Sequence, residues 1–276
     1  MPTLAERVEA IQWYHTLELA PGVVTPGHFD TRGAVDKVPL PARLDGLRCL
    51  DVGTWDGFWA FEMERRGAAS VTAIDVADPE RWDWPAQMRL GENAGLAYLS
   101  AFKAAGAGFR LAHEALGSRV EWRDRSVYEL DPEIDGRFDV VLLGSLLLHL
   151  RDPVGALERI RSVCARDLVL TDTVELVSSI VRPRTPTARL EGIDRPWWWQ
   201  PNVAALRRMV HSAGFEIVER RGLHFVALGA SHPRPPWRGL LRSLATPATR
   251  EGIVNRVLGV PHSALRARPL PVEPAA

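Results

Sequence analysis

A short glycine-bounded turn carries the clearest chemical signature in this chain of 276 residues. It reads Leu50-Asp51-Val52-Gly53-Thr54-Trp55-Asp56-Gly57 and lies at the end of an apolar run. In an open parallel sheet, ligands bind beyond the carboxyl ends of the strands, where such a turn lets the backbone approach them closely. Gly53 can adopt a conformation closed to residues with a Cβ, and Gly57 opens the next helix without a side chain. The turn therefore predicts a ligand site with exposed backbone N–H groups.

The ligand predicted for this turn contains a ribose but no pyrophosphate. A dinucleotide site favours G-x-G-x-x-G, which places the pyrophosphate on the helix N-terminus. Here Trp55 stands at the position of the middle glycine and disfavours a phosphate cradle. Asp75 ends the next apolar run, about 20 residues past the turn, where a carboxylate can accept hydrogen bonds from both ribose hydroxyls.

Alternating strands and helices must position these residues. The apolar patterns predict a strand–turn–helix–strand unit over 48–76, and alternation of this kind is typical of a mainly parallel sheet. We expect an α/β, Rossmann-like sheet of seven strands with an antiparallel edge and helices on both faces. The predicted strands are 48–52, 70–76, 119–123, 138–143, 167–171, 215–219 and 223–228, and the helices are 58–66, one within 93–116, 153–164 and 201–213.

The remaining segments are predicted to surround this domain. Residues 1–46 hold a helix that begins with the capping box Thr3-x-x-Glu6, then a Pro- and Gly-broken loop over 21–41 that could act as a lid. Residues 47–230 form the Rossmann-like domain, in which 173–200 are a substrate insert. Residues 231–276 are Pro- and Arg-rich, and we expect them to be a loosely attached tail.

Composition narrows the function classes. Apolar residues make up 46% and charged residues 25%, so the chain can bury a core without disulfides or a structural metal. Cys49 and Cys164 lie in apolar runs, which fits a reducing cytoplasm, and no metal-ligand spacing is present. No apolar run is long enough to span a membrane. Net charge is zero, and only Lys37 and Lys103 among 34 basic residues are lysines.

The turn and the following acid together resemble the class I S-adenosylmethionine-dependent methyltransferases. In that superfamily the first motif is D-x-G-x-x-x-G and the second is an acid at the end of strand two. The resemblance covers about residues 47–228 and is strongest to the tRNA wobble-uridine 5-oxyacetate methyltransferase-like group. The similar segments are DVGTWDGFWAFEMERRGA, FDVVLLGSLLLHLRDP, WYHTLELAPGVVTPGHFD and WWWQPNVAALRRMVHSAGF.

This resemblance implies a cofactor site for S-adenosylmethionine. The glycine-bounded turn would flank the methionine part of the cofactor. Asp75 and Val76 would contact its ribose and adenine, and Ser145, which follows strand four, would lie beside its sulfonium. Members that use the carboxylated cofactor have Tyr-His after strand four, whereas this chain has Leu148-His149, and Thr16 to Arg32 contains no Lys. Ordinary S-adenosylmethionine is therefore expected. The cofactor set is Asp51, Gly53, Thr54, Trp55, Gly57, Asp75, Val76, Ser126, Val127 and Ser145.

Methyl transfer needs alignment of nucleophile, carbon and sulfur, and a base only where the acceptor must lose a proton. His149 is the first candidate base, although a structural bond to a backbone carbonyl is an equal alternative, and His15 is the second. The tryptophans after the insert could form an aromatic wall. The expected substrate residues are Trp13, Tyr14, His28, Asp30, Trp198 and Trp199, and surface or packing roles are expected for His113, His211, His224, His232 and His262.

Three functions follow from these observations. The first is O-methylation of a small molecule such as a sugar or secondary metabolite, with N-methylation less favoured. The second is methylation of a tRNA wobble uridine, for which seven Arg from His232 onward, against Glu251 and Glu273, would provide an electrostatic handle. The rest of the chain carries about −5 by difference and does not attract nucleic acid. The third is a catalytically silent cofactor-binding scaffold. Oligomeric state is left open.

Overall fold

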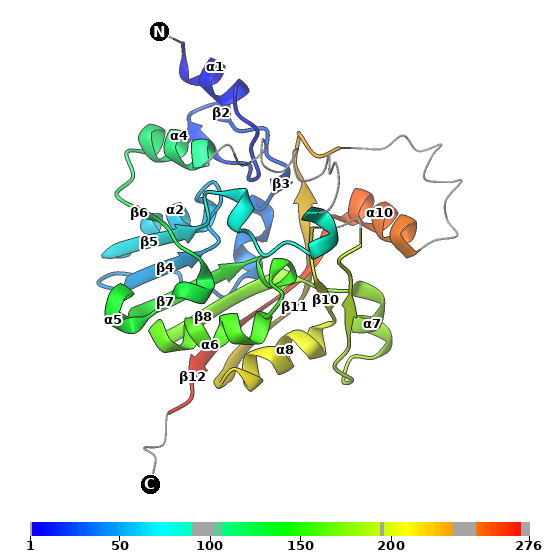
Figure 1. Cartoon of the computed structure of the whole chain (residues 1–276). Coiled ribbons are helices and arrows are strands. Elements are labelled where there is room, and N and C mark those ends of the chain that lie inside the picture. The colour runs from blue at the N-terminus through cyan, green and yellow to red at the C-terminus, as the bar shows by residue number, and fades with distance from the viewer. Residues whose placement is uncertain (1, 90–102, 104–105, 194–195, 234–246, 272–276) are drawn as a thin grey trace.

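A computed structural model describes residues 2–89, 103, 106–193, 196–233 and 247–271, and it is built around one eight-stranded sheet (Figure 1). The strand order is β3-β11-β12-β8-β7-β4-β5-β6. Pairs among β4, β5, β6, β7 and β8 are parallel, and β3, β11 and β12 join antiparallel. The strands are β3 (Phe29–Asp30), β4 (Arg48–Val52), β5 (Ser70–Asp75), β6 (Glu121–Asp124), β7 (Phe138–Gly144), β8 (Cys164–Thr173), β11 (Phe215–Leu228) and β12 (Val260–Pro269).

Helices cover both faces of the sheet, as predicted, and alternate strand residues supply two cores. Leu50 and Val141 point to the face covered by α6 and α8, whereas Cys49 and Val140 point to the face covered by α2 and α4. In Figure 1, α5, α6 and α8 lie in front of the sheet. These helices are α2 (Phe58–Arg65), α4 (Ala107–Leu116), α5 (Pro132–Asp135), α6 (Pro153–Val163) and α8 (Val203–Ser212).

The C-terminal region corrects the expectation of a loose tail. β12 lies inside the sheet, hydrogen-bonded to β11 on one side and to β8 on the other. Its residues Ala264, Leu265 and Ala267 are at most 1% exposed. The two strands predicted over 215–228 are one long strand, β11, so the sheet has eight strands because β12 and the short β3 are added. Before β12 the chain forms α10 (Pro247–Leu258).

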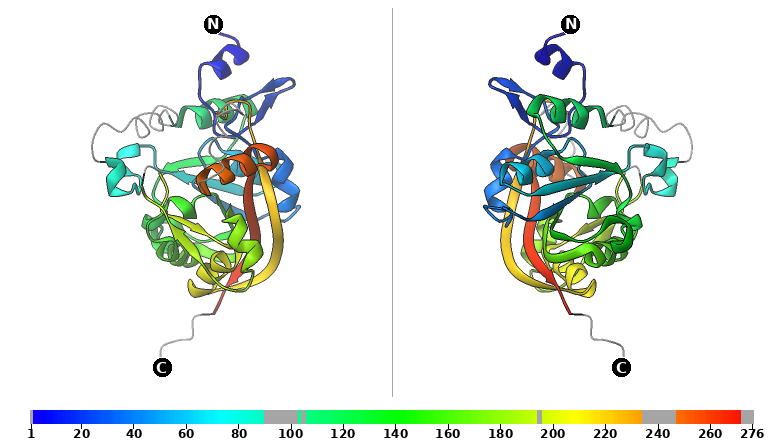
Figure 2. Two further views of the ribbon diagram at one scale, coloured as in Figure 1. Left: turned by 90° about the vertical axis from the view of Figure 1, so that its right-hand side faces the viewer. Right: turned by 90° about the vertical axis from the view of Figure 1, so that its left-hand side faces the viewer.

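The N-terminal segment folds over one end of the sheet. The predicted capping box is present at Thr3, but α1 is short (Leu4–Glu9), and a hairpin of β1 (Glu18–Ala20) and β2 (Val23–Val24) follows it. The proposed loop over 21–41 also contains β3 and the 3-10 helix η1 (Arg32–Lys37). Both views in Figure 2 show α1 and this hairpin beside α4, at the end opposite the C-terminus.

The insert over 173–200 holds α7 (Leu176–Val181) and a second hairpin, of β9 (Ala188–Leu190) and β10 (Trp199–Pro201). Within 93–116, the described part confirms a helix at α4, and residues 93–102, 104 and 105 lie outside the described residues. Cys49 and Cys164 are free and buried. No helix in the described ranges is long and apolar enough to cross a membrane, and no cluster of potential metal ligands occurs in them.

Candidate active site

The predicted turn lies at the carboxyl end of β4 and needs both of its glycines. Gly53 has φ +77° and Gly57 has φ +90°, and a Cβ on Gly57 would lie 2.4 Å from Cε2 of Phe61. Trp55, between them, also has a positive φ, at 50°. A bulky residue rarely adopts this conformation, so the surrounding contacts must hold the Trp55 ring in place.

The expectation that the turn exposes backbone N–H groups is wrong for most of its residues. The Gly53 and Thr54 N–H groups donate to the Ile74 carbonyl at 2.9 and 3.1 Å, and Gly57 N–H donates to the Thr54 carbonyl at 2.8 Å. Trp55 N–H donates to Oδ2 of Asp75 at 2.7 Å. Recognition at this turn therefore falls largely to side chains and carbonyl oxygens.

Asp75 ends β5 beside the turn, where it was predicted to meet a ribose. Its carboxylate accepts hydrogen bonds from the N–H groups of Trp55 and of Val76, each at 2.7 Å. Its Oδ1 also forms an ion pair with Nζ of Lys103. The carboxylate is therefore held in a fixed orientation, and the lysine already occupies one of its acceptor positions.

Lys103 is a site residue that the sequence reasoning missed. Its side chain is 3% exposed, and its ammonium lies 4.8 Å from the Trp55 ring centroid and 4.9 Å from that of Trp82. A buried lysine requires such a counter-ion and ring faces. The available signal was its rarity as one of two lysines in the chain, but only the fold brings it to Asp75.

Two buried polar atoms in the turn fit the cationic methionine part of S-adenosylmethionine. Oδ2 of Asp51 and Oγ1 of Thr54 are buried without a hydrogen-bond partner in the described structure. Burial raises the pKa of Asp51 to about 7, and the charge of Asp75 adds to this shift. An acidic group in such a position gains a partner when an ammonium group binds. Asp51 and Thr54 would hold the amino group, and Asp75 the ribose.

Cofactor affinity is expected to increase with pH below 7. Binding an ammonium group favours ionised Asp51, so a proton must leave when the pH is below its raised pKa of about 7. Calorimetry between about pH 5.5 and 7, where the cofactor amino group stays charged, should show affinity rising by up to about tenfold per pH unit. Asp51→Asn should flatten this slope. Asp56 is a matched buried acid whose pKa is also about 7, and Asp56→Asn should keep the slope of affinity against pH. An unchanged slope in Asp51→Asn would contradict the assignment of Asp51 to the amino group.

The N-terminal segment is attached to the same turn through Asp56. Oδ2 of this buried carboxylate accepts hydrogen bonds from the N–H groups of Tyr14 and His15, at 2.6 and 3.0 Å. The Tyr14 ring lies 4.7 Å from that of Trp55. His15 packs on Phe58 at 5.5 Å, and burial lowers its pKa to about 3, so its ring is neutral. The predicted cover over the site is thus anchored to the cofactor turn.

The other residues of this segment that were predicted to bind substrate lie in different surroundings. Trp13 is completely buried and donates its Nε1–H to the Val8 carbonyl at 2.9 Å, so it is a core residue and does not reach a substrate. The Asp30 carboxylate, on the edge strand β3, accepts three hydrogen bonds from Arg32, two from its guanidinium and one from its backbone N–H. The His28 ring lies 4.0 Å from that of His232, and burial, aided by His232, lowers its pKa to about 4.

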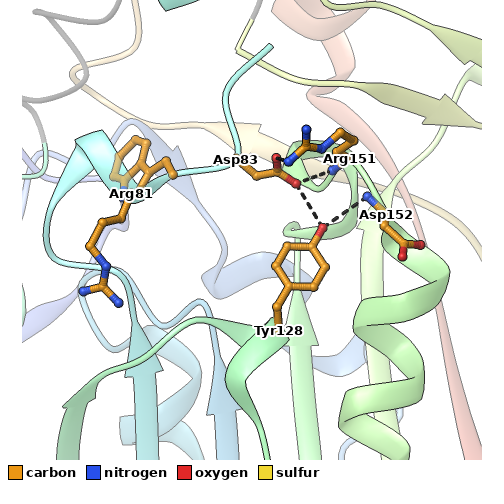
Figure 3. A pocket seen from close by; sticks show the side chains of 6 residues that line it. Arg81, Asp83, Tyr128, Arg151 and Asp152 are labelled. Carbon is orange, nitrogen blue, oxygen red and sulfur yellow. Dashed lines mark hydrogen bonds and ion pairs between the residues drawn. The ribbon is translucent and has the colours of Figure 1, made fainter. Parts of the chain in front are cut away.

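A cleft of about 380 Å³ adjoins the predicted adenine side (Figure 3). Ser126 caps the 3-10 helix η5 (Val127–Glu129), and Val127 is buried beneath it. The next residue, Tyr128, points into the cleft, donating to Oδ2 of Asp83 at 3.0 Å and accepting from Asp152 N–H at 3.1 Å. The cleft is lined by Arg81, Trp82, Asp83, Tyr128, Arg151 and Asp152.

His149 and two of the predicted tryptophans lie together beyond β7. His149 belongs to the 3-10 helix η6 (Leu147–His149), and its Nδ1 lies 2.9 Å from the Pro196 carbonyl oxygen. Trp198 donates to the Asp83 carbonyl and Trp199 to the Arg151 carbonyl, at 2.5 and 3.0 Å. Both rings are half-buried. The two tryptophans therefore join the insert to the cleft wall.

His262 corrects the expectation that it has only a surface or packing role. Although it lies on β12, its Nε2 is 2.9 Å from Oγ of Ser145, the predicted sulfonium neighbour. Asp172, also missed, is buried beside them and accepts hydrogen bonds from Leu146, Leu147 and Thr173 N–H. Burial raises its pKa to about 7, and these three hydrogen bonds oppose the shift.

Comparison with known proteins agrees with this arrangement. Residues 28–220 match the family described as a methyltransferase domain. The tRNA U34 carboxymethyltransferase of Ectopseudomonas mendocina is 26% identical over 199 residues, covering 69% of this chain and 53% of that protein. The ubiquinone biosynthesis O-methyltransferase of Neisseria meningitidis is 26% identical over 213 residues, 72% of this chain and 76% of that protein. The chain thus spans about half the length of the tRNA-modifying relatives it matches.

A solved structure supports the fold. The complex between the Haloferax volcanii Trm112 methyltransferase activator and a methyltransferase aligns with a TM-score of 0.51 at 14% identity, covering 89% of this chain and 90% of that one. Because the family match covers more than half of the chain, the protein belongs to the methyltransferase domain family. It is a class I S-adenosylmethionine-dependent methyltransferase.

Proposed function

We propose that this enzyme transfers the methyl group of S-adenosylmethionine to an oxygen atom of a small molecule. The observation that carries the proposal is the fixed tautomer of His149. A carbonyl oxygen only accepts, so the Nδ1 that faces Pro196 O must bear the hydrogen. Nε2 of the neutral ring is then an acceptor to which no described group donates, as a base for a hydroxyl group must be. The structural bond and the catalytic role are therefore compatible.

The protonation state of His149 suits this role. Burial lowers its pKa, the Pro196 carbonyl opposes this effect, and the charge of Lys103 adds to it. The ring is thus neutral near pH 7 and can take a proton while the acceptor oxygen attacks. Bound S-adenosylmethionine supplies the activated methyl group, so the protein's remaining task is to align the acceptor and exclude water. Tyr14 and His15 would cover the site, because Asp56 fixes both.

A small acceptor is favoured over tRNA because the arginines near the site are already paired with acidic residues. Arg81 pairs with Asp124 at 3.0 Å, and Arg151 pairs with Asp83 at 3.2 Å. In the C-terminal region Arg266 and Arg268 pair with acids on neighbouring strands instead of facing a ligand. Such neutralised arginines release few counter-ions from a nucleic acid. An aromatic wall of Trp198 and Trp199 fits an apolar or sugar-like acceptor instead.

Cell extract incubated with the enzyme and methyl-labelled S-adenosylmethionine tests the proposal, with mass spectrometry to identify the labelled product. We expect a small O-methylated compound. His149→Ala should reduce turnover by about 10²- to 10⁴-fold while cofactor affinity is unchanged, because general bases contribute that much. His211→Ala, an exposed histidine on α8, is the matched control and should behave as wild type. Equal turnover in His149→Ala would contradict the assigned base.

The same experiment distinguishes the alternatives. Label in tRNA, together with a salt-sensitive gel shift, would favour the wobble-uridine activity. Cofactor binding without label in any acceptor would favour a silent scaffold. We also propose that the enzyme works in the cytoplasm, because both cysteines are free and buried, as is usual in a reducing compartment.

A further inference from the structure

The residue after β7 is held in an unusual backbone conformation by contacts with neighbouring strands. Ser145 has φ 52°, although it is not a glycine. Its N–H donates to the Thr171 carbonyl on β8 at 2.9 Å, and its Oγ lies 2.9 Å from Nε2 of His262 on β12. A strained residue at a functional position is a reason to ask what its side chain does.

The hydrogen bonds of His262 determine which way the Ser145 hydroxyl hydrogen points. Nδ1 of His262 lies 2.9 Å from the Val260 carbonyl oxygen, which only accepts, so Nδ1 carries the hydrogen. Burial lowers the pKa of His262 to about 4, so the ring is neutral and Nε2 is an acceptor. Ser145 must therefore donate to Nε2. Its oxygen lone pairs are left for other partners.

The groups around His262 do not reverse the direction of the hydrogen bond from Ser145 to Nε2. His224 faces it from β11, with ring centroids 5.9 Å apart, and burial lowers the pKa of His224 as well. On β8, the Thr173 hydroxyl also lies within reach of Nε2, at 3.4 Å, but the Ser145 hydroxyl is closer, at 2.9 Å, and is the better donor to the one lone pair. Asp172 on the same strand uses its carboxylate oxygens for backbone N–H groups. No described ionic partner competes for Nε2.

Ser145 is also connected to the cofactor turn. Its neighbour Leu146 packs against Gly53, since a Cβ built on that glycine would lie 3.1 Å from Cδ2 of Leu146. Ser145 is half-buried, whereas His262 is 4% exposed. The serine oxygen can therefore reach a ligand above the turn, and the histidine can act only through the serine.

We propose that His262 is a positioning residue that makes Ser145 Oγ an acceptor-only oxygen directed at the positive sulfonium of the cofactor. Lone pairs attract this cation, whereas a hydroxyl hydrogen would repel it. The inference rests on cofactor use and not on the identity of the methyl acceptor. On this proposal, the C-terminal strand β12 contributes to discrimination between the charged methyl donor, S-adenosylmethionine, and its neutral product, S-adenosylhomocysteine.

The test compares the dissociation constants of S-adenosylmethionine and S-adenosylhomocysteine, which differ at the sulfur in charge and methyl group. Ser145→Ala and His262→Phe should each weaken binding of the charged ligand by about five- to tenfold relative to the neutral one, an effect as large as that of an ordinary hydrogen bond. His262→Gln keeps an acceptor and should restore the ratio. The double variant Ser145→Ala/His262→Phe should show no further change, because both act through one oxygen.

Two controls keep this test decisive. Thermal melting separates folding from binding, and loss of both affinities by the same factor would mean a purely structural role and overturn the proposal. Should His262→Phe fail to fold, nitrogen-15 NMR of the wild type tests the same step. The expected result is a protonated Nδ1 and an unprotonated Nε2 in His262. A protonated Nε2 at neutral pH would overturn it. If the methyl acceptor proves not to be a small molecule, the ligand ratio is unaffected.

Discussion

Deleting residues 260–276 is expected to abolish folding. β12 hydrogen-bonds to β11 from Phe215↔Pro269 to Val226↔Val260, and to β8 from His262↔Thr173 to Ala267↔Leu168. Its removal would leave two long strands with exposed edges and open the core around Leu265. The loss would exceed the net stability of a domain, which is about 5–15 kcal/mol. Circular dichroism and size-exclusion chromatography of the truncated chain, residues 1–259, should show an unfolded or aggregated protein.

Matched variants separate the strand from the residues after it. A chain ending at Pro271 keeps every described contact of β12 and should melt as the full chain does. Within this region Leu265→Asp places a charge at a position that is 1% exposed and should unfold the protein, whereas Leu270→Asp, at 37% exposure, should be tolerated. A folded 1–259 fragment with the melting temperature of the full chain would contradict this view of β12.

The composition of β12 explains why the sequence did not predict it as a strand. It contains Pro261, Pro269, Arg266 and Arg268, which are typical of a solvated tail. In the fold, Arg266 pairs with Glu219 at 3.0 Å and Arg268 with Asp167 at 3.3 Å. These acids lie at least 47 residues away along the chain, so their neutralising effect has no local signal. Hydrophobic periodicity does not predict a strand whose charged residues are neutralised only by residues distant in the sequence.

The candidate site likewise contains residues that local sequence patterns predict and residues whose roles depend on distant contacts. The turn was predictable because its glycines are required by local backbone geometry, which the observed φ angles of Gly53 and Gly57 bear out. Lys103 and His262 reach the site from distant segments, and their roles depend on pairing with Asp75 and Ser145. Residue type gave no sign of these partners. Local chemistry was thus predicted from sequence, whereas tertiary chemistry was not.

Asp75→Ala is expected to raise the dissociation constant of S-adenosylmethionine by about 10- to 100-fold. Trp55 N–H, Val76 N–H and Lys103 use three of the about four lone-pair positions of this carboxylate, so the substitution removes the acceptor of one ribose hydroxyl, and a hydrogen bond to a charged group contributes about 1.5–3 kcal/mol. It also removes the counter-ion of Lys103, whose side chain is 3% exposed. Leaving a buried charge unpaired costs about 3–5 kcal/mol, so the melting temperature should fall as well. Calorimetry and thermal melting measure the two effects separately.

Lys103→Met distinguishes loss of the cofactor contact from loss of stability. The double variant Asp75→Ala/Lys103→Met removes both charges of this ion pair, so stability should recover while binding stays weak. Lys103→Met alone leaves Asp75 held by the N–H groups of Trp55 and Val76 and frees one of its acceptor positions, so affinity should be retained or increased. Asp45→Asn, an exposed acid paired with Arg43, is the matched control and should change neither quantity. If Lys103→Met lost affinity as Asp75→Ala does, or if the double variant bound normally, the lysine and not the acid would be the group that governs cofactor binding.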